Sequence, residues 1–195
     1  MNKKLGWLIG LLGLLLLLGG ASVLYSRMSN EAAPPPVAAA STETEAAEEG
    51  AMEAVSAPDF TVLDSEGTSV SLSDFFGKPI ILNFWASWCS PCKSEMPDFD
   101  AAYQQYGEEI QFLMVNLTDG VQETLESAKT FIADSSYSFP VFFDTEYSAA
   151  IAYGATSIPA TYFVNPEGNL VAYGVDPLNT EALETGIGMI TESAE

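Results

Sequence analysis

The sequence contains no histidine, only two cysteines, and six Lys and Arg against 27 Asp and Glu among 195 residues. Without histidine there can be no Ser-His-Asp triad, no Cys-His protease pair and no histidine-ligated zinc, copper or haem. Two cysteines are too few for a four-ligand zinc site or an iron–sulfur cluster within one chain. The net charge of −21 argues against a nucleic-acid partner, which requires clustered positive charge. The sequence therefore predicts no metal and no cofactor.

Near the start of the chain lies an uncharged run of 22 residues, Leu5 to Ser26, preceded by Lys3 and Lys4. This length suits a helix that crosses the hydrocarbon core, which takes about 20 apolar residues. The positive-inside rule then places the N-terminus in the cytoplasm. A cleaved signal peptide is the alternative, although no A-x-A site ends the run. We expect residues 1–27 to be an uncleaved single-pass anchor in the cell membrane, with everything after it exported.

Residues 28–57 are rich in Pro, Ala and Glu and contain no aromatic residue. Such a segment cannot bury enough apolar surface to offset the entropy cost of ordering it. We interpret it as a disordered tether that holds a domain away from the membrane, and a spacer of no fixed role fits equally well. The remaining residues, 58–195, are numerous enough to build one core.

Strand and helix patterns succeed one another along this last part. The expected strands are 60–63, 69–72, 79–85, 110–117, 139–143, 161–164 and 170–173, and the expected helices are 91–106, 123–133, 147–153 and 180–190. The turn at Asp64–Gly67 predicts that the first two strands form a hairpin. The apolar run Pro79–Trp85 suits a central strand buried on both faces. The pattern predicts an α/β fold with a mixed central sheet, helices on both faces and an N-terminal β-hairpin extension.

The two cysteines, Cys89 and Cys92, stand between a predicted buried strand and a predicted helix. A disulfide between them would close a loop too short to stabilise the fold much, so reversible exchange is the better interpretation. The N-terminus of the helix offers unpaired N–H groups and the positive end of its dipole, which lower the pKa of the first cysteine. Cys89 is therefore the predicted nucleophile and Cys92 the resolving thiol, with Pro91 fixing the start of the helix.

The segment Asn83–Lys93, NFWASWCSPCK, resembles the active site of thioredoxins. More narrowly, the chain is similar to the membrane-anchored, exported reductases of the TlpA/ResA family, at Leu72–Phe75, Gly77–Pro79, Ser94–Pro97, Ile158-Pro159 and Phe163–Gly168. This resemblance covers residues 58–195 and implies a thioredoxin-like fold. It also implies reduction of protein disulfides outside the cytoplasmic membrane, often in cytochrome c maturation. The implied partners are a disulfide-containing protein substrate, with apocytochrome c as one candidate, and an exported or transmembrane thiol donor.

The resemblance assigns a docking role to residues around the cysteine pair. Ile158-Pro159 matches the cis-proline motif beside the two sulfurs, where the Ile158 backbone pairs with an incoming chain. Residue patterns alone favour an ordinary loop proline there. Trp88, Ser90 and Pro91 are expected to shape the substrate-binding rim, and plain packing is the alternative for Trp88.

Glu95, three residues after Cys92, has two possible roles. It could simply be an early-helix acid that complements the dipole. In related exported reductases a glutamate at this position exchanges protons with the resolving thiol, through a pKa raised by partial burial. Typical thioredoxins use an Asp in the preceding strand, where this chain has Asn83, which cannot titrate. We predict the proton-transfer role for Glu95.

Two other activities are alternatives for the cysteine pair. A thiol peroxidase of the peroxiredoxin branch needs Pro-x-x-x-Thr-x-x-Cys, but Leu82 and Ala86 occupy the Pro and Thr positions before Cys89. A non-catalytic thiol-binding module such as a copper chaperone would want a histidine besides its cysteines. The leading prediction is an enzyme, a thiol-disulfide oxidoreductase, and loss of activity on replacing Cys89 would separate it from a binding module.

Overall fold

The computed structural model describes residues 54–191, which form one seven-stranded mixed sheet of order β2-β1-β5-β4-β3-β6-β7. The central strands β3, β4 and β5 are parallel, and the other pairings are antiparallel. The strands are β1 (Thr61–Leu63), β2 (Ser69–Ser71), β3 (Ile80–Trp85), β4 (Gln111–Asn116), β5 (Val141–Phe143), β6 (Ala160–Val164) and β7 (Leu170–Gly174). The hairpin β1–β2 joins the sheet through β5, so the predicted N-terminal extension is confirmed.

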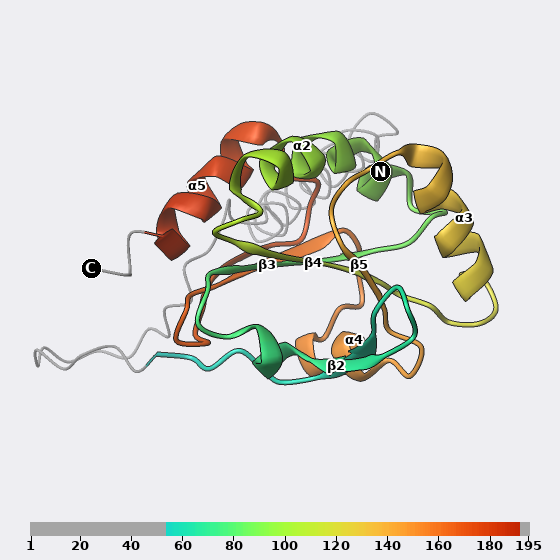
Figure 1. Cartoon of the computed structure of the whole chain (residues 1–195), viewed down its shortest axis with the longest axis horizontal. Helices are drawn as coiled ribbons and strands as arrows, with labels where there is room; N and C mark the ends of the chain where they lie inside the picture. The colour runs from blue at the N-terminus through green and yellow to red at the C-terminus, as the bar shows by residue number, and fades with distance from the viewer. Residues whose placement is uncertain (1–53, 192–195) are drawn as a thin grey trace, which may run out of the picture. The chain divides into compact units, whose positions relative to one another are not determined.

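Helices cover both faces of this sheet. They are the 3-10 helix η1 (Leu72–Phe75), α2 (Ser90–Tyr106), α3 (Leu125–Ser135), α4 (Ser148–Tyr153) and α5 (Thr180–Thr191). Figure 1 shows α2, α3 and α5 on one side of the sheet, and η1 and α4 on the other. The predicted α/β fold with a mixed sheet and helices on both faces is therefore confirmed.

Strand β3 divides the core into two layers because successive side chains point to opposite faces of a strand. All six of its residues are buried. Ile81 and Trp85 join the core beneath α2 and α5, whereas Leu82 and Phe84 join the core beneath α4. Asn83 shares the face of Ile81 and Trp85, so its polar side chain points into the layer that holds α2.

The folded part of the chain begins earlier than the sequence predicted. The amide of Ala57 donates to the carbonyl of Gly168 at 2.9 Å, and the carbonyl of Val55 accepts from the amide of Leu170 at 2.8 Å. These backbone bonds attach the segment to the β6–β7 hairpin, so the last three residues assigned to the tether, 55–57, belong to the domain. The predicted anchor and residues 28–53 of the predicted tether lie outside the described residues. Within residues 54–191, no helix is both long and apolar enough to cross a membrane.

Candidate active site

The redox pair lies where β3 passes through a tight turn into α2. The amide of Cys89 donates to the carbonyl of Ala86 at 3.1 Å, which closes the turn. Cys89 is the N-cap of α2, and the amide of Cys92 donates to its Sγ at 3.2 Å. Pro91 stands in the first turn of the helix. The predicted position of the pair at a helix N-terminus is thus observed, and an orphan N–H of the helix points at the first sulfur.

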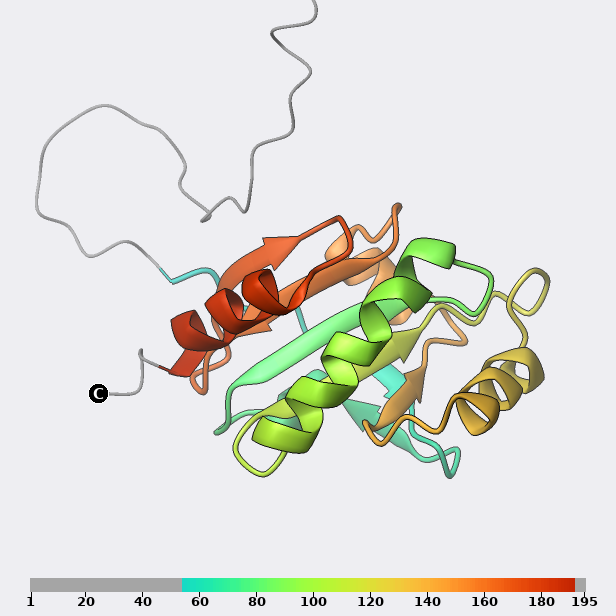
Figure 2. The same cartoon turned by 90° about the horizontal axis from the view of Figure 1, so that it is seen from above.

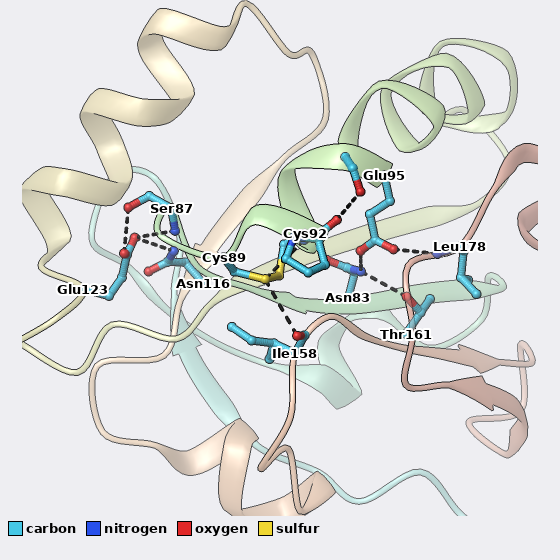
Figure 3. Close-up of a disulfide and its surroundings, with 12 residues drawn as sticks. Asn83, Ser87, Cys89, Cys92, Glu95, Asn116, Glu123, Ile158, Thr161 and Leu178 are labelled. Atoms are coloured by element: carbon cyan, nitrogen blue, oxygen red, sulfur yellow. Dashed lines mark hydrogen bonds between the residues drawn. A yellow bond between two sulfur atoms is a disulfide. The ribbon is translucent and has the colours of Figure 1, made fainter. Parts of the chain in front are cut away.

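Cys89 and Cys92 form a disulfide with a Cα–Cα separation of 5.3 Å. Cys92 is fully buried and Cys89 is 3% exposed, so only Cys89 offers any surface to solvent in this state. The Ile158-Pro159 peptide bond is cis, as expected, and the carbonyl oxygen of Ile158 lies 3.7 Å from Cys89 Sγ. Figure 3 shows this carbonyl pointing at the disulfide from the loop that precedes β6.

Exposed side chains surround the more accessible sulfur. Trp88, immediately before Cys89, is 48% exposed, and Ser90 and Pro91 are also exposed. Trp85 is fully buried beneath them. The structure therefore gives the two tryptophans the different environments that the sequence predicted, one in the core and one at the rim of the site.

Glu95 is buried on the α2 face that meets the sheet, with 2% of its surface exposed. Its Oε1 accepts from Asn83 Nδ2 at 2.8 Å, and its Oε2 accepts from the amide of Leu178 at 2.8 Å. Asn83 Nδ2 also donates to Thr161 Oγ1 at 3.0 Å, across the β3–β6 pairing. The carboxyl is thus held by three separate parts of the chain: its own helix, the central strand and the segment that precedes α5.

Burial raises the pKa of Glu95 from its ordinary value of 4.5 to about 7. Removal of the carboxylate from water is the largest cause, and the nearby charge of Asp98 adds to it. The hydrogen bonds from Leu178 and Asn83 favour the charged form and limit the rise. Glu95 stands one helical turn after Cys92, and a pKa of about 7 suits a carboxyl to proton exchange near neutral pH.

A second buried carboxylate, Glu123, was not recognised in the sequence. Its Oε1 accepts from the amide of Ser87 at 3.1 Å and from Asn116 Nδ2 at 3.0 Å, and its Oε2 accepts from Ser87 Oγ at 2.7 Å. Figure 3 shows Glu123 and Glu95 on opposite sides of the disulfide. The sequence placed Glu123 in the first turn of a helix, but Thr124 is the N-cap of α3, which leaves Glu123 in the preceding loop with its side chain turned inward.

A family model described as the AhpC/TSA family matches residues 54–173, more than half of the chain. The chain belongs to the AhpC/TSA family. It is 35% identical to "Thiol-disulfide oxidoreductase ResA" of Bacillus subtilis strain 168 over 127 residues, which span 65% of this chain and 69% of that protein. It is 31% identical to "Thioredoxin-like protein YneN" of the same strain over 137 residues, 70% of this chain and 79% of that one.

Comparison with solved structures supports the same family relationship. StoA from Bacillus subtilis matches with a TM-score of 0.59 and 27% identity, over 67% of this chain and 97% of that one. The exposed lipoprotein thioredoxin Etrx1 from Streptococcus pneumoniae matches with a TM-score of 0.59 and 31% identity, over 66% of this chain and 98% of that one. This AhpC/TSA-family member therefore has the thioredoxin-like fold and is a thiol-disulfide oxidoreductase of the TlpA/ResA type.

Proposed function

We propose that this enzyme reduces disulfides in protein substrates outside the cytoplasmic membrane, with Cys89 as the attacking thiolate and Cys92 as the resolving thiol. The observation that carries the proposal is the asymmetry of the disulfide: Cys89 alone offers surface, at the N-cap of α2, while Cys92 is fully buried. A helix N-terminus stabilises a thiolate, which is the nucleophile of disulfide exchange.

The reaction has two exchange steps. The Cys89 thiolate attacks one sulfur of the substrate disulfide, and the other substrate sulfur leaves as a thiolate that takes up a proton. Cys92 then loses its proton and attacks Cys89 Sγ, which releases the second substrate thiolate. The substrate gains two electrons and two protons, and the enzyme is left with the Cys89–Cys92 disulfide present in the structure.

Glu95 accepts the proton that Cys92 must lose. A carboxyl with a pKa of about 7 is partly ionised at neutral pH and can act as a general base there. Asn83 hydrogen-bonds this carboxyl but cannot titrate itself, which leaves Glu95 as the base on this side of the disulfide.

The substrate chain docks in extended form along the loop that precedes β6. The Ile158 backbone, held beside the sulfur by the cis bond to Pro159, offers hydrogen bonds to a chain that adds like a short strand. Trp88, Ser90 and Pro91 form the opposite rim, and their exposure supports this role.

The enzyme is held at the membrane by residues 1–27, on a tether that ends where the folded part begins. The uncharged run of 22 residues after two lysines supports this topology, and one solved relative is named an exposed lipoprotein. The substrates include apocytochrome c, and an exported or transmembrane thiol donor returns two electrons to the disulfide.

Replacement of Cys92 by Ser in the full chain tests these assignments, because the mixed disulfide on Cys89 can then no longer be resolved. We expect partner proteins to remain covalently bound to the Cys92→Ser variant and to be released by a reductant, where mass spectrometry identifies them. The matched Cys89→Ser variant should trap none. After a reductant has released the trapped partners, Cys89 of this variant should react with a membrane-impermeant thiol reagent on intact cells. Equal trapping by both variants, or no labelling of intact cells, would contradict the proposal.

A further inference from the structure

The buried carboxylate of Glu123 has no part in the reaction described above. It is fully buried, and its two oxygens accept three hydrogen bonds, two of them from Ser87 and one from Asn116. A buried charge is costly unless it is hydrogen-bonded, and bonds to a charged acceptor are the stronger kind. The arrangement therefore fixes Ser87 tightly to the end of β4.

Ser87 is an interior residue of the turn that carries the attacking sulfur. The turn is closed by the bond from the Cys89 amide to Ala86, and it sets Cys89 Sγ against the amide of Cys92. A displacement of Ser87 would move Trp88 and Cys89 with it, because they follow directly in the chain. The carboxylate thus holds an interior residue of the turn that places the sulfur at the helix N-terminus.

The backbone of Glu123 belongs to a second loop, which the side chain of Asp119 closes. Asp119 Oδ1 accepts from the amides of Val121 at 2.7 Å and Glu123 at 2.8 Å, and the amide of Gly120 donates to the carbonyl of Glu123 at 2.9 Å. These bonds hold Val121 at the tip of the loop, where it is 89% exposed. Figure 2 shows this loop, between β4 and α3, beside the turn that opens α2.

We propose that Glu123 is a positioning residue of the redox centre. It joins the turn that carries Trp88 and Cys89 to the loop that presents Val121, and the two exposed apolar side chains then flank the substrate disulfide. The enzyme accordingly favours substrates with an apolar residue beside the reactive cysteine. This inference rests on the proposed function, because it takes Cys89 as the residue that attacks a protein disulfide.

Two substitutions of Glu123 distinguish the effect of its side-chain position from the effect of its charge. The carbonyl oxygen of Gln in Glu123→Gln can accept from the Ser87 amide and from Asn116, and its NH₂ group can donate to the Ser87 hydroxyl, which rotates. This variant keeps the position and loses the charge, whereas Glu123→Ala loses both. Asp100 offers a matched control, since its carboxylate also accepts from the amide and the hydroxyl of one serine, Ser138, at 2.6 and 2.8 Å. It lies more than two helical turns beyond Cys92.

The experiment uses the full chain and two disulfide-bonded peptides that differ only in a Leu or a Ser beside the reactive cysteine. For Glu123→Ala we expect kcat/KM to fall about 10- to 100-fold, the scale of a misplacement near 1 Å, and alkylation of reduced Cys89 at pH 7 to slow as well. Glu123→Gln should recover most of both rates, and Asp100→Ala should match the wild type. The inference is wrong if Glu123→Ala behaves like Asp100→Ala, or if Glu123→Gln is as slow as Glu123→Ala.

Val121→Ser keeps the inference testable if Glu123→Ala does not fold, because Val121 is on the surface. We expect the preference for the Leu peptide, as a ratio of kcat/KM values, to fall by about three- to tenfold. An unchanged ratio would overturn the selection of apolar neighbours. A wild-type enzyme that reduces neither peptide would instead contradict the proposed function itself.

Discussion

Replacement of Glu95 by Gln removes the carboxyl that we propose as the acceptor of the Cys92 proton. The substitution should keep the fold. The Gln oxygen can accept from the Leu178 amide, and Asn83 Oδ1, which has no hydrogen-bond partner within residues 54–191, can turn to accept from the Gln NH₂ group. Any change in the pH dependence of the variant then reports on the carboxyl and not on a collapsed site.

The pKa of Glu95 sets the size of the effect on stability. The rise from 4.5 to about 7 means that the folded protein binds more protons than the unfolded chain between these pH values. The stabilisation by this group is fully present below pH 4.5 and is lost as the pH rises through about 7. At about 1.4 kcal/mol per pH unit, the wild type should lose about 3 kcal/mol relative to Glu95→Gln over this interval.

The assay is urea unfolding of the oxidised wild type and variant at pH values from 4.5 to 8. The free energies of unfolding of the two proteins are compared at each pH, because the other carboxyl groups contribute equally to both and cancel in the difference. In parallel, release of substrate from the mixed disulfide is followed by stopped flow. We expect the variant to resolve it about 100-fold more slowly near pH 7, the usual scale of general base catalysis. A stability difference that stays flat with pH would refute the raised pKa, and an unchanged pH–rate profile would remove Glu95 from the mechanism.

Three further predictions concern the surroundings of the site. Asn83→Asp places a second carboxyl within hydrogen-bond distance of Glu95, so the pKa of one of them should rise further and the pH–rate profile of exchange should shift to higher pH; an unshifted profile would contradict the coupling. A methyl group at Gly186 would overlap the Phe163 ring, so Gly186→Ala should cost about 1–3 kcal/mol in urea unfolding, whereas Gly188→Ala on the same helix has free space and should cost nothing. Reduction of the disulfide should lower the free energy of unfolding by about 2 kcal/mol or less, because it opens a loop of only four residues; a much larger loss would favour a structural role.

The order of the strands and α-helices could be predicted because each carries a strong local pattern, whereas the short 3-10 helix η1 was not predicted and Leu72 was assigned to a strand. The apolar run of β3, its junction with the helix of Cys89 and Cys92, and the turn between β6 and β7 all lie within short stretches of sequence. The cis bond before Pro159 was predicted from the family resemblance, since residue patterns alone favoured an ordinary loop proline.

The partners of the buried carboxyls could not be predicted, because tertiary folding brings them together. Glu95 meets the amide of Leu178 across 83 positions of sequence, and Glu123 meets Ser87 across 36. Glu123 stands immediately before the N-cap of α3. In the sequence it looks like an acidic residue in the first turn of that helix, where acidic residues are common because they complement the helix dipole. Because the predicted start of α3 was two residues too early, nothing in the sequence indicated that Glu123 is buried beside the redox centre.

The activity requires that the bond between Cys89 and Cys92 opens and closes reversibly. The most direct measurement equilibrates the protein in dithiothreitol buffers of graded oxidised-to-reduced ratio, alkylates the free thiols and counts them by mass spectrometry. We predict one transition in which both cysteines change together, with a two-electron slope of about 30 mV per tenfold change in ratio. A disulfide that stays closed across all ratios, or cysteines that never bond to each other, would contradict the account.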